Sequence, residues 1–188
     1  GDATAIKVSI HRFDQALIHL DKKNIDISTR ALYRLYPGFI DSYVNEILNL
    51  DASDTTKVTK MFQEFLSDTI FSSVNRKTLQ VFDNITDIEQ NLSSAFTNLH
   101  YFFPEVKIPE VYFFVSGFNR SILVNKNWIG VGADLFLGSD YPQYQNFTYK
   151  YLIKNMKPQQ ITPFVVSALL YNNFSFNPSN DRLLENIL

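Results

Sequence analysis

The sequence predicts an α+β fold that is mainly helical and contains a small sheet of three to four strands. Three observations predict it. Apolar residues recur at helical spacing over 13–104, short β-branched and aromatic segments occupy 109–134, and helical spacing returns over 143–188. The chain has 188 residues and no internal repeat, so we expect a single domain over 1–188.

The first helical part follows a short strand expected over residues 5–12. Ser53 or Asp54 can accept the first free N–H groups of a further helix. Thr86 and Glu89 have the spacing of a capping box, which predicts a helix that begins there and ends near residues 101–104. Four other segments before the sheet have helical spacing: 13–20, 25–35, 39–50 and 68–82.

The sheet is expected to contain a buried strand and a hairpin. Residues 125–127, Asn-Lys-Asn, are a plausible tight loop between the hairpin strands, and Gly130 and Gly132 are expected to permit close backbone approach or a bulge. The three predicted strands lie within residues 109–117, 121–124 and 128–133. The helices expected after the sheet cover residues 143–156, 160–171 and 178–188.

Composition excludes several classes of protein. The 17 basic and 19 acidic side chains nearly balance, which argues against a nucleic-acid binder that relies on a basic field. The chain contains no Cys, so disulfides, thiolate metal sites and a Cys nucleophile are excluded. No apolar run is long enough for a transmembrane helix, and the first residues do not resemble a signal peptide.

Catalytic and cofactor motifs are missing from the sequence. The three histidines form no His-Glu-x-x-His pattern, residues 51–62 lack the Gly and Glu of a calcium loop, and Gly130-Val-Gly132 lacks the third Gly of a dinucleotide fingerprint. There is no Walker A and no Gly-x-Ser-x-Gly sequence. We therefore expect no enzyme activity, no catalytic residues, no metal and no cofactor, although a triad assembled from distant residues cannot be recognised in a sequence.

The segment around residues 128–144 is the best candidate for a functional site. A strand ends at Asp134, and a glycine turn then leads to Asp140 and Tyr144. We expect these residues, with Trp128, to line a groove or a partner site at the end of the sheet. The alternative is an ordinary strand-to-helix connection with cap chemistry.

The same segment resembles a known family. The run Ile129–Tyr144, with its Ile-Gly, Leu-Gly and Asp-Tyr-Pro elements, is similar to a block of the GldB family of gliding-motility lipoproteins. Residues 10–14, 98–104 and 109–118 resemble, in order, other blocks of that family. Where the family more often has Leu and Tyr, this chain has Ala133 and Phe136.

The resemblance implies an envelope lipoprotein of gliding, Bacteroidetes-type bacteria. It would face the periplasm, be anchored in the membrane through a lipidated N-terminal Cys that is absent here, and bind envelope protein partners of the motility or secretion machinery, but no nucleic acid. Gly1-Asp2 resembles the remnant of a cloned start rather than a native one, so we expect trimming at the N-terminus. Family members are longer, and this chain ends within an apolar periodic run, so we also expect a C-terminal part that is missing or that differs between lineages.

The family is also distantly similar to predicted zinc peptidases, whose His-Glu-x-x-His lies on a helix after such a sheet. The corresponding segment here, 161–171, has no His and no acid, which implies a degenerate zinc-peptidase-like fold. The first hypothesis is thus a non-catalytic lipoprotein domain that binds protein partners. The second is a hydrolase that uses Asp134 and Asp140, and the third is a peptide-binding groove along a sheet edge.

Overall fold

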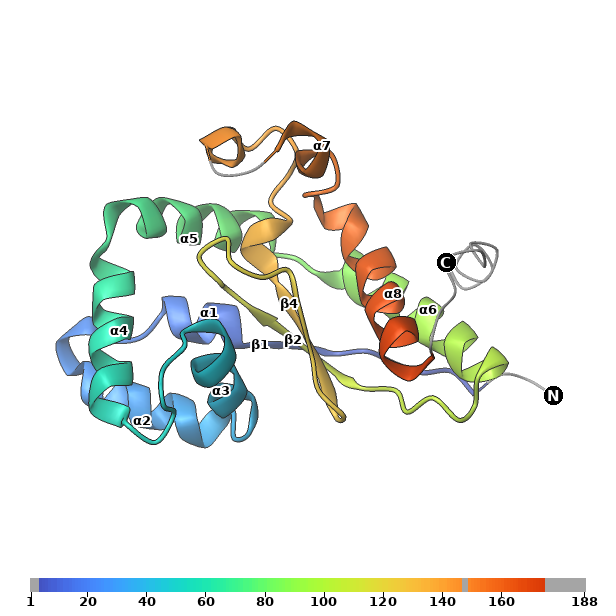
Figure 1. Cartoon of the computed structure of the whole chain (residues 1–188), viewed down its shortest axis with the longest axis horizontal. Coiled ribbons are helices and arrows are strands. Elements are labelled where there is room, and N and C mark those ends of the chain that lie inside the picture. Colours follow the sequence, from blue (N-terminus) through green and yellow to red (C-terminus); the bar gives the residue numbers. More distant parts are fainter. Residues whose placement is uncertain (1–3, 147–148, 175–188) are drawn as a thin grey trace.

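Four strands form a mixed sheet at the centre of the molecule (Figure 1). The structure, a computed structural model, describes residues 4–146 and 149–174. The order of the strands is β1-β2-β4-β3, in which β1, β2 and β4 run parallel and β3 is antiparallel to β4. The strands are β1 (Ile10–Arg12), β2 (Glu110–Phe114), β3 (Ile122–Val124) and β4 (Trp128–Gly132). The predicted α+β class with a small sheet is confirmed.

Helices cover both faces of this sheet. The α-helices are α1 (Phe13–Ile18), α2 (Ile25–Leu35), α3 (Phe39–Ser42), α4 (Thr55–Ser67), α5 (Thr69–Val81), α6 (Thr86–Phe102), α7 (Lys150–Ile153) and α8 (Ile161–Asn173). Short 3-10 helices lie at Lys22–Asn24, Ala133–Leu135, Pro142–Asn146 and Pro158–Gln160. Asp54 and Asp68 cap α4 and α5 by accepting backbone N–H bonds, and α2 has the predicted bounds.

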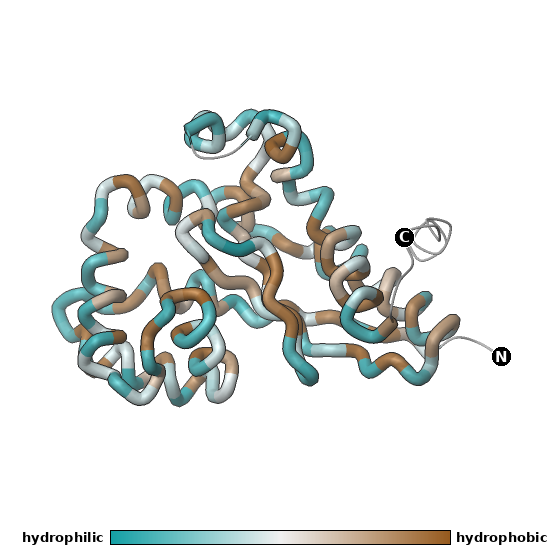
Figure 2. The backbone as a smooth tube through the Cα atoms, in the orientation of Figure 1, coloured by the Kyte–Doolittle hydropathy of each residue, from teal (hydrophilic) through white to brown (hydrophobic). Residues whose placement is uncertain are grey.

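The alternation of side chains along the strands divides the core between the two faces. Val111 and Phe113 of β2 point to one face, where they pack with α6 and α8. Tyr112 and Phe114 point to the other face, where they pack with α1 to α4. Figure 2 shows the hydrophobic strands running between the two groups of helices.

The capping box predicted at Thr86 is wrong. The residue before the helix is Ile85, whose side chain makes no cap bond, and the N–H of Thr86 donates instead to Oδ1 of Asn84 at 2.9 Å. Glu89 instead accepts the backbone N–H of Ile10 at 2.8 Å. Further along α6, hydroxyls accept the N–H groups of Val8 and Ile6, at 2.9 and 3.0 Å. One face of α6 thus provides these N–H groups with the acceptors that a neighbouring strand would otherwise provide. Of the strand predicted over residues 5–12, only residues 10–12 pair with β2.

Two predicted helices are shorter than expected. The helix over 39–50 changes into a π-helical turn at Tyr43–Ile47 and ends there, and Asn49 has a positive φ of 54°. The expected helix over 143–156 is replaced by the 3-10 helix Pro142–Asn146 and the single turn of α7. The helix predicted from residue 178 lies outside the described residues.

The hairpin of β3 and β4 forms as predicted, and its glycines permit close packing. A Cβ at Gly132 would lie 2.0 Å from the carbonyl oxygen of Arg120. A Cβ at Gly130 would lie 3.0 Å from the ring of Phe114. Close approach, the first alternative for these glycines, is therefore confirmed.

Candidate functional site

Polar residues follow the carboxyl ends of all three parallel strands, which share one edge of the sheet. Arg12 ends β1, Ser116 follows β2 and Asp134 follows β4. In open sheets with parallel strands, ligands commonly bind at this edge. Burial and hydrogen bonding decide which of these groups are available for chemistry.

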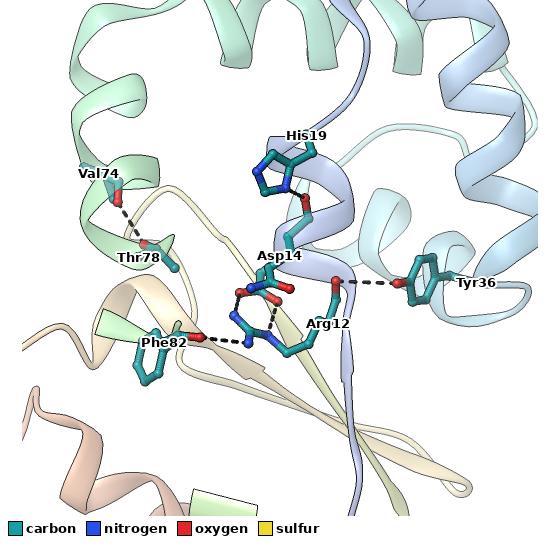
Figure 3. A network of polar contacts seen from close by, with 8 residues as sticks. Arg12, Asp14, His19, Tyr36, Val74, Thr78 and Phe82 are labelled. Atoms are coloured by element: carbon teal, nitrogen blue, oxygen red, sulfur yellow. Dashed lines mark hydrogen bonds and ion pairs between the residues drawn. The ribbon is translucent and has the colours of Figure 1, made fainter. Parts of the chain in front are cut away.

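Asp14, in the first turn of α1, is buried and paired with Arg12 (Figure 3). Nε and Nη2 of Arg12 donate to the two carboxylate oxygens at 3.0 and 2.9 Å. The third nitrogen of the guanidinium, Nη1, donates to the carbonyl oxygen of Phe82 at 2.8 Å. Phe82 directly follows α5. The guanidinium of Arg12 therefore ties the end of β1 to the end of α5, and the Asp14 carboxylate, which accepts a hydrogen bond from Arg12 on each oxygen, holds that guanidinium in place.

Asp134 is equally buried, but its partners carry no charge. Its oxygens accept the backbone N–H groups of Ser116, at 2.9 Å, and of Phe118, at 2.7 Å. The hydroxyl of Ser116 lies 3.3 Å from the nearer oxygen. Burial raises the pKa of Asp134, and the hydrogen bonds act against that rise. The carboxylate holds a turn in which Gly117 and Phe118 have positive φ values of 66° and 61°.

Of the other predicted site residues, only Tyr144 lies beside Asp134. Its buried hydroxyl donates to the carbonyl oxygen of Asp134 at 2.7 Å and accepts the N–H of Leu137 at 2.9 Å. Trp128 lies at the opposite end of β4, where its ring packs against Phe39 at 4.9 Å. Asp140 is exposed. The structure thus brings two of the four residues together, in the interior, and leaves the other two apart from them.

A cleft of about 430 Å³ opens beside this edge, and we call it the turn cleft. It lies between the turn after β2, the segment from α3 to residue 48, and helices α4 and α5. Its lining residues are Tyr43, Ile47, Leu48, Met61, Glu64, Phe65, Asp68, Phe71, Ser116, Gly117 and Asn119. Asp134 determines its shape from behind, because it fixes the Ser116–Phe118 turn that forms one wall.

The turn cleft combines an apolar interior with acidic groups. The rings of Phe65 and Phe71 lie 4.9 Å apart, and Met61 is half-buried beside them. Glu64 and Asp68 are exposed. Ser-Gly after a predicted strand is a turn signal that could have indicated this wall. No sequence signal places α4 and α5 opposite it.

A second, more apolar cleft of about 300 Å³ lies beneath α7, and we call it the α7 cleft. It is lined by Phe118, Ser121, Leu135, Phe136, Leu152, Asn155, Met156 and Phe164. Phe118 belongs to the turn that Asp134 holds. The two clefts therefore lie on either side of one turn.

The histidines take part in local contacts. His11 lies 2.8 Å from Glu110 and stacks on Tyr112, and His19 contacts the carbonyl of Gln15 at 2.9 Å. Within 4–146 and 149–174 no group of three or more His, Asp or Glu residues could hold a metal ion. Helix α8 contains no His, Asp or Glu.

Comparison with known proteins identifies the family. The sequence model of gliding motility protein GldB, a lipoprotein family, matches residues 1–188. The chain belongs to the GldB family. Membership implies a lipoprotein associated with gliding motility. No curated protein and no solved structure matches this GldB-family chain. None of the helices in its described part is long and apolar enough to cross a membrane.

Proposed function

We propose that this GldB-family chain is a non-catalytic, periplasm-facing lipoprotein domain that supports the gliding-motility or related envelope machinery by binding protein partners. One observation carries the non-catalytic part of the proposal. Asp134, the carboxylate placed where chemistry is most expected, is fully buried, and each of its oxygens accepts a backbone N–H. A general acid or base must reach its substrate within hydrogen-bond distance.

The turn cleft is the surface we assign to the partner. Its apolar interior around Met61, Phe65 and Phe71 suits a protruding apolar side chain, and the exposed acids Glu64 and Asp68 suit flanking Lys or Arg residues. The proposed ligand is therefore an apolar and basic segment of another envelope protein. Asp134 and Tyr144 contribute from the interior by holding the wall of the cleft. Trp128 and the exposed Asp140 lie apart from this cleft and remain predicted contact residues.

Addition of a peptide strand to the outer edge of β1 is less favourable. The N–H groups of Ile6, Val8 and Ile10 already donate to side chains of α6. A peptide would have to displace those bonds before it gained its own. This supports the cleft, rather than that sheet edge, as the binding surface.

The experiment is quantitative capture of proteins from an envelope extract of the source bacterium. Met61→Lys places a charge inside the cleft, and Gln63→Lys places the same charge on an exposed position of the same helix, outside the cleft. We expect wild type and Gln63→Lys to retain the same envelope proteins, and Met61→Lys to lose them. Equal capture by both variants would refute the assignment of the cleft.

A further inference from the structure

The charge of the chain is unevenly distributed. Residues 1–140 contain 13 Lys and Arg against 17 Asp and Glu. Residues 141–174 contain Lys150, Lys154 and Lys157 and no acidic residue. This basic stretch includes α7, in a chain whose overall charge is negative.

Apolar side chains are exposed among these lysines. Tyr149 and Tyr151 expose 72% and 66% of their surface, and Leu152 exposes 45%. The two tyrosine rings stack with their centroids 5.8 Å apart. Figure 1 shows α7 at the top of the molecule, away from the sheet. These exposed apolar side chains therefore form a surface patch rather than the rim of the core around the sheet.

The lysines beside these rings have no acidic partner among the residues that the structure describes. Lys150 and Lys154 are exposed, and no ion pair found within the described ranges involves them or Lys157. Leu152 and Met156 also line the α7 cleft, so the apolar surface continues from the exposed rings inward to Phe164. The segment thus has an apolar tip with cationic groups around it.

We propose that residues 149–157 contact the headgroup region of an anionic lipid bilayer. Tyrosine suits the boundary between water and hydrocarbon, because its ring is apolar and its hydroxyl is polar. Lysines next to such rings attract anionic headgroups. A helix of four residues offers far less area than the roughly 800 Å² per partner of a stable protein interface, whereas a bilayer can accept a few inserted side chains. This contact is separate from the turn cleft and from any covalent lipid.

The test is sedimentation of the 188-residue chain with phosphatidylcholine vesicles that either contain or lack phosphatidylglycerol. We expect binding to the anionic vesicles that weakens as salt is raised. Lys150→Glu with Lys154→Glu should lower that binding at least about tenfold. The matched control, Lys22→Glu with Lys23→Glu, reverses two exposed lysines of the 3-10 helix Lys22–Asn24 and should leave binding unchanged.

A second variant separates the rings from the charges. Tyr149→Ser with Tyr151→Ser should weaken binding to anionic vesicles while the salt dependence remains, because both lysines are still present. Circular dichroism of each variant verifies that the fold is retained. The proposal is overturned if wild type binds neither vesicle, if it binds both equally, or if the control loses as much binding as the α7 variants. Each result is independent of the capture experiment on the turn cleft.

Discussion

Asp14 and Asp134 are two carboxylates at the same edge of one sheet, equally buried but stabilised differently. Asp14 faces the guanidinium of Arg12, whereas Asp134 faces two backbone N–H groups and a hydroxyl. Burial of a charge requires a counter-charge or well-placed dipoles, and this edge uses one solution at each position. In both residues each carboxylate oxygen accepts a hydrogen bond from within the protein. We propose that the carboxylates of this edge hold the turn and the helices around the turn cleft.

The largest expected effect comes from removal of the counter-charge at Asp14. Arg12→Ala leaves a buried, unpaired carboxylate and should lower the free energy of unfolding by about 3–5 kcal/mol, measured by urea denaturation. The control, Arg12→Met with Asp14→Leu, removes both charges and should recover most of that loss. If Arg12→Ala were as stable as wild type, the ion pair would not be the element that holds β1 to α5.

Replacement of Asp134 by Asn should cost less than Arg12→Ala, because it leaves no unpaired buried charge. In Asp134→Asn one carboxylate oxygen becomes an NH2 group that faces an N–H donor of Ser116 or Phe118. We expect a loss of about 2 kcal/mol in the free energy of unfolding. Hydrogen exchange measured by NMR should be faster at whichever of these two amides loses its acceptor. Unchanged exchange at both amides would mean that Asp134 does not hold the turn.

The pH dependence of stability tests the environment of Asp134. Burial raises the pKa of Asp134 above the 3.8 of an unfolded chain, so the native state holds this proton more tightly than the unfolded state does. The resulting stabilisation of the native state is complete below the pKa of the unfolded chain, and it is lost as pH rises through the higher pKa of the native state. The stability advantage of wild type over Asp134→Asn should therefore shrink as pH rises. An advantage that grows with pH would show that the N–H bonds outweigh burial.

The smallest effect is expected at Tyr144, which reaches only the backbone of Asp134. Tyr144→Phe leaves the buried N–H of Leu137 without its acceptor and should cost about 1–2 kcal/mol in thermal or urea unfolding. The control is Tyr101→Phe, since Tyr101 is 61% exposed and its hydroxyl should contribute little. If Tyr144→Phe lowered the free energy of unfolding as much as Arg12→Ala does, the proposed ranking of these three sites by their contribution to stability would be wrong.

Local signals predicted most of the helices but few of the long-range contacts. Asp54, one of the two predicted alternatives, caps α4, because a cap needs partners only two or three residues away. Glu89 matched a local motif but bonds to Ile10, which lies 79 residues earlier. A local pattern cannot reveal such a competitor. The pairing of β1 with β2 also joins residues that lie far apart in the sequence, and no local pattern predicts it.

The candidate site was predicted in part for the same reason. The position of Asp134 after β4 follows from the strand pattern. Its partners do not, since Ser116 lies 18 residues upstream in a turn with positive φ values. Trp128 and Asp140 are close to Asp134 in sequence, but the direction of the strand and the exposed turn separate them from it. The turn cleft depends on α4 and α5, which only the folded chain brings there.

The central claim is that Asp134 has a structural role and that the turn cleft binds the protein partner. Colony spreading of the source bacterium, with its gene replaced by each variant and spreading normalised to folded protein, tests this most directly. The account predicts that Asp134→Asn, at a temperature where it folds, loses at most part of the spreading, because one acceptor for the turn remains, whereas folded Met61→Lys does not spread. A folded Asp134→Asn that fails to spread, together with a Met61→Lys that spreads normally, would contradict it.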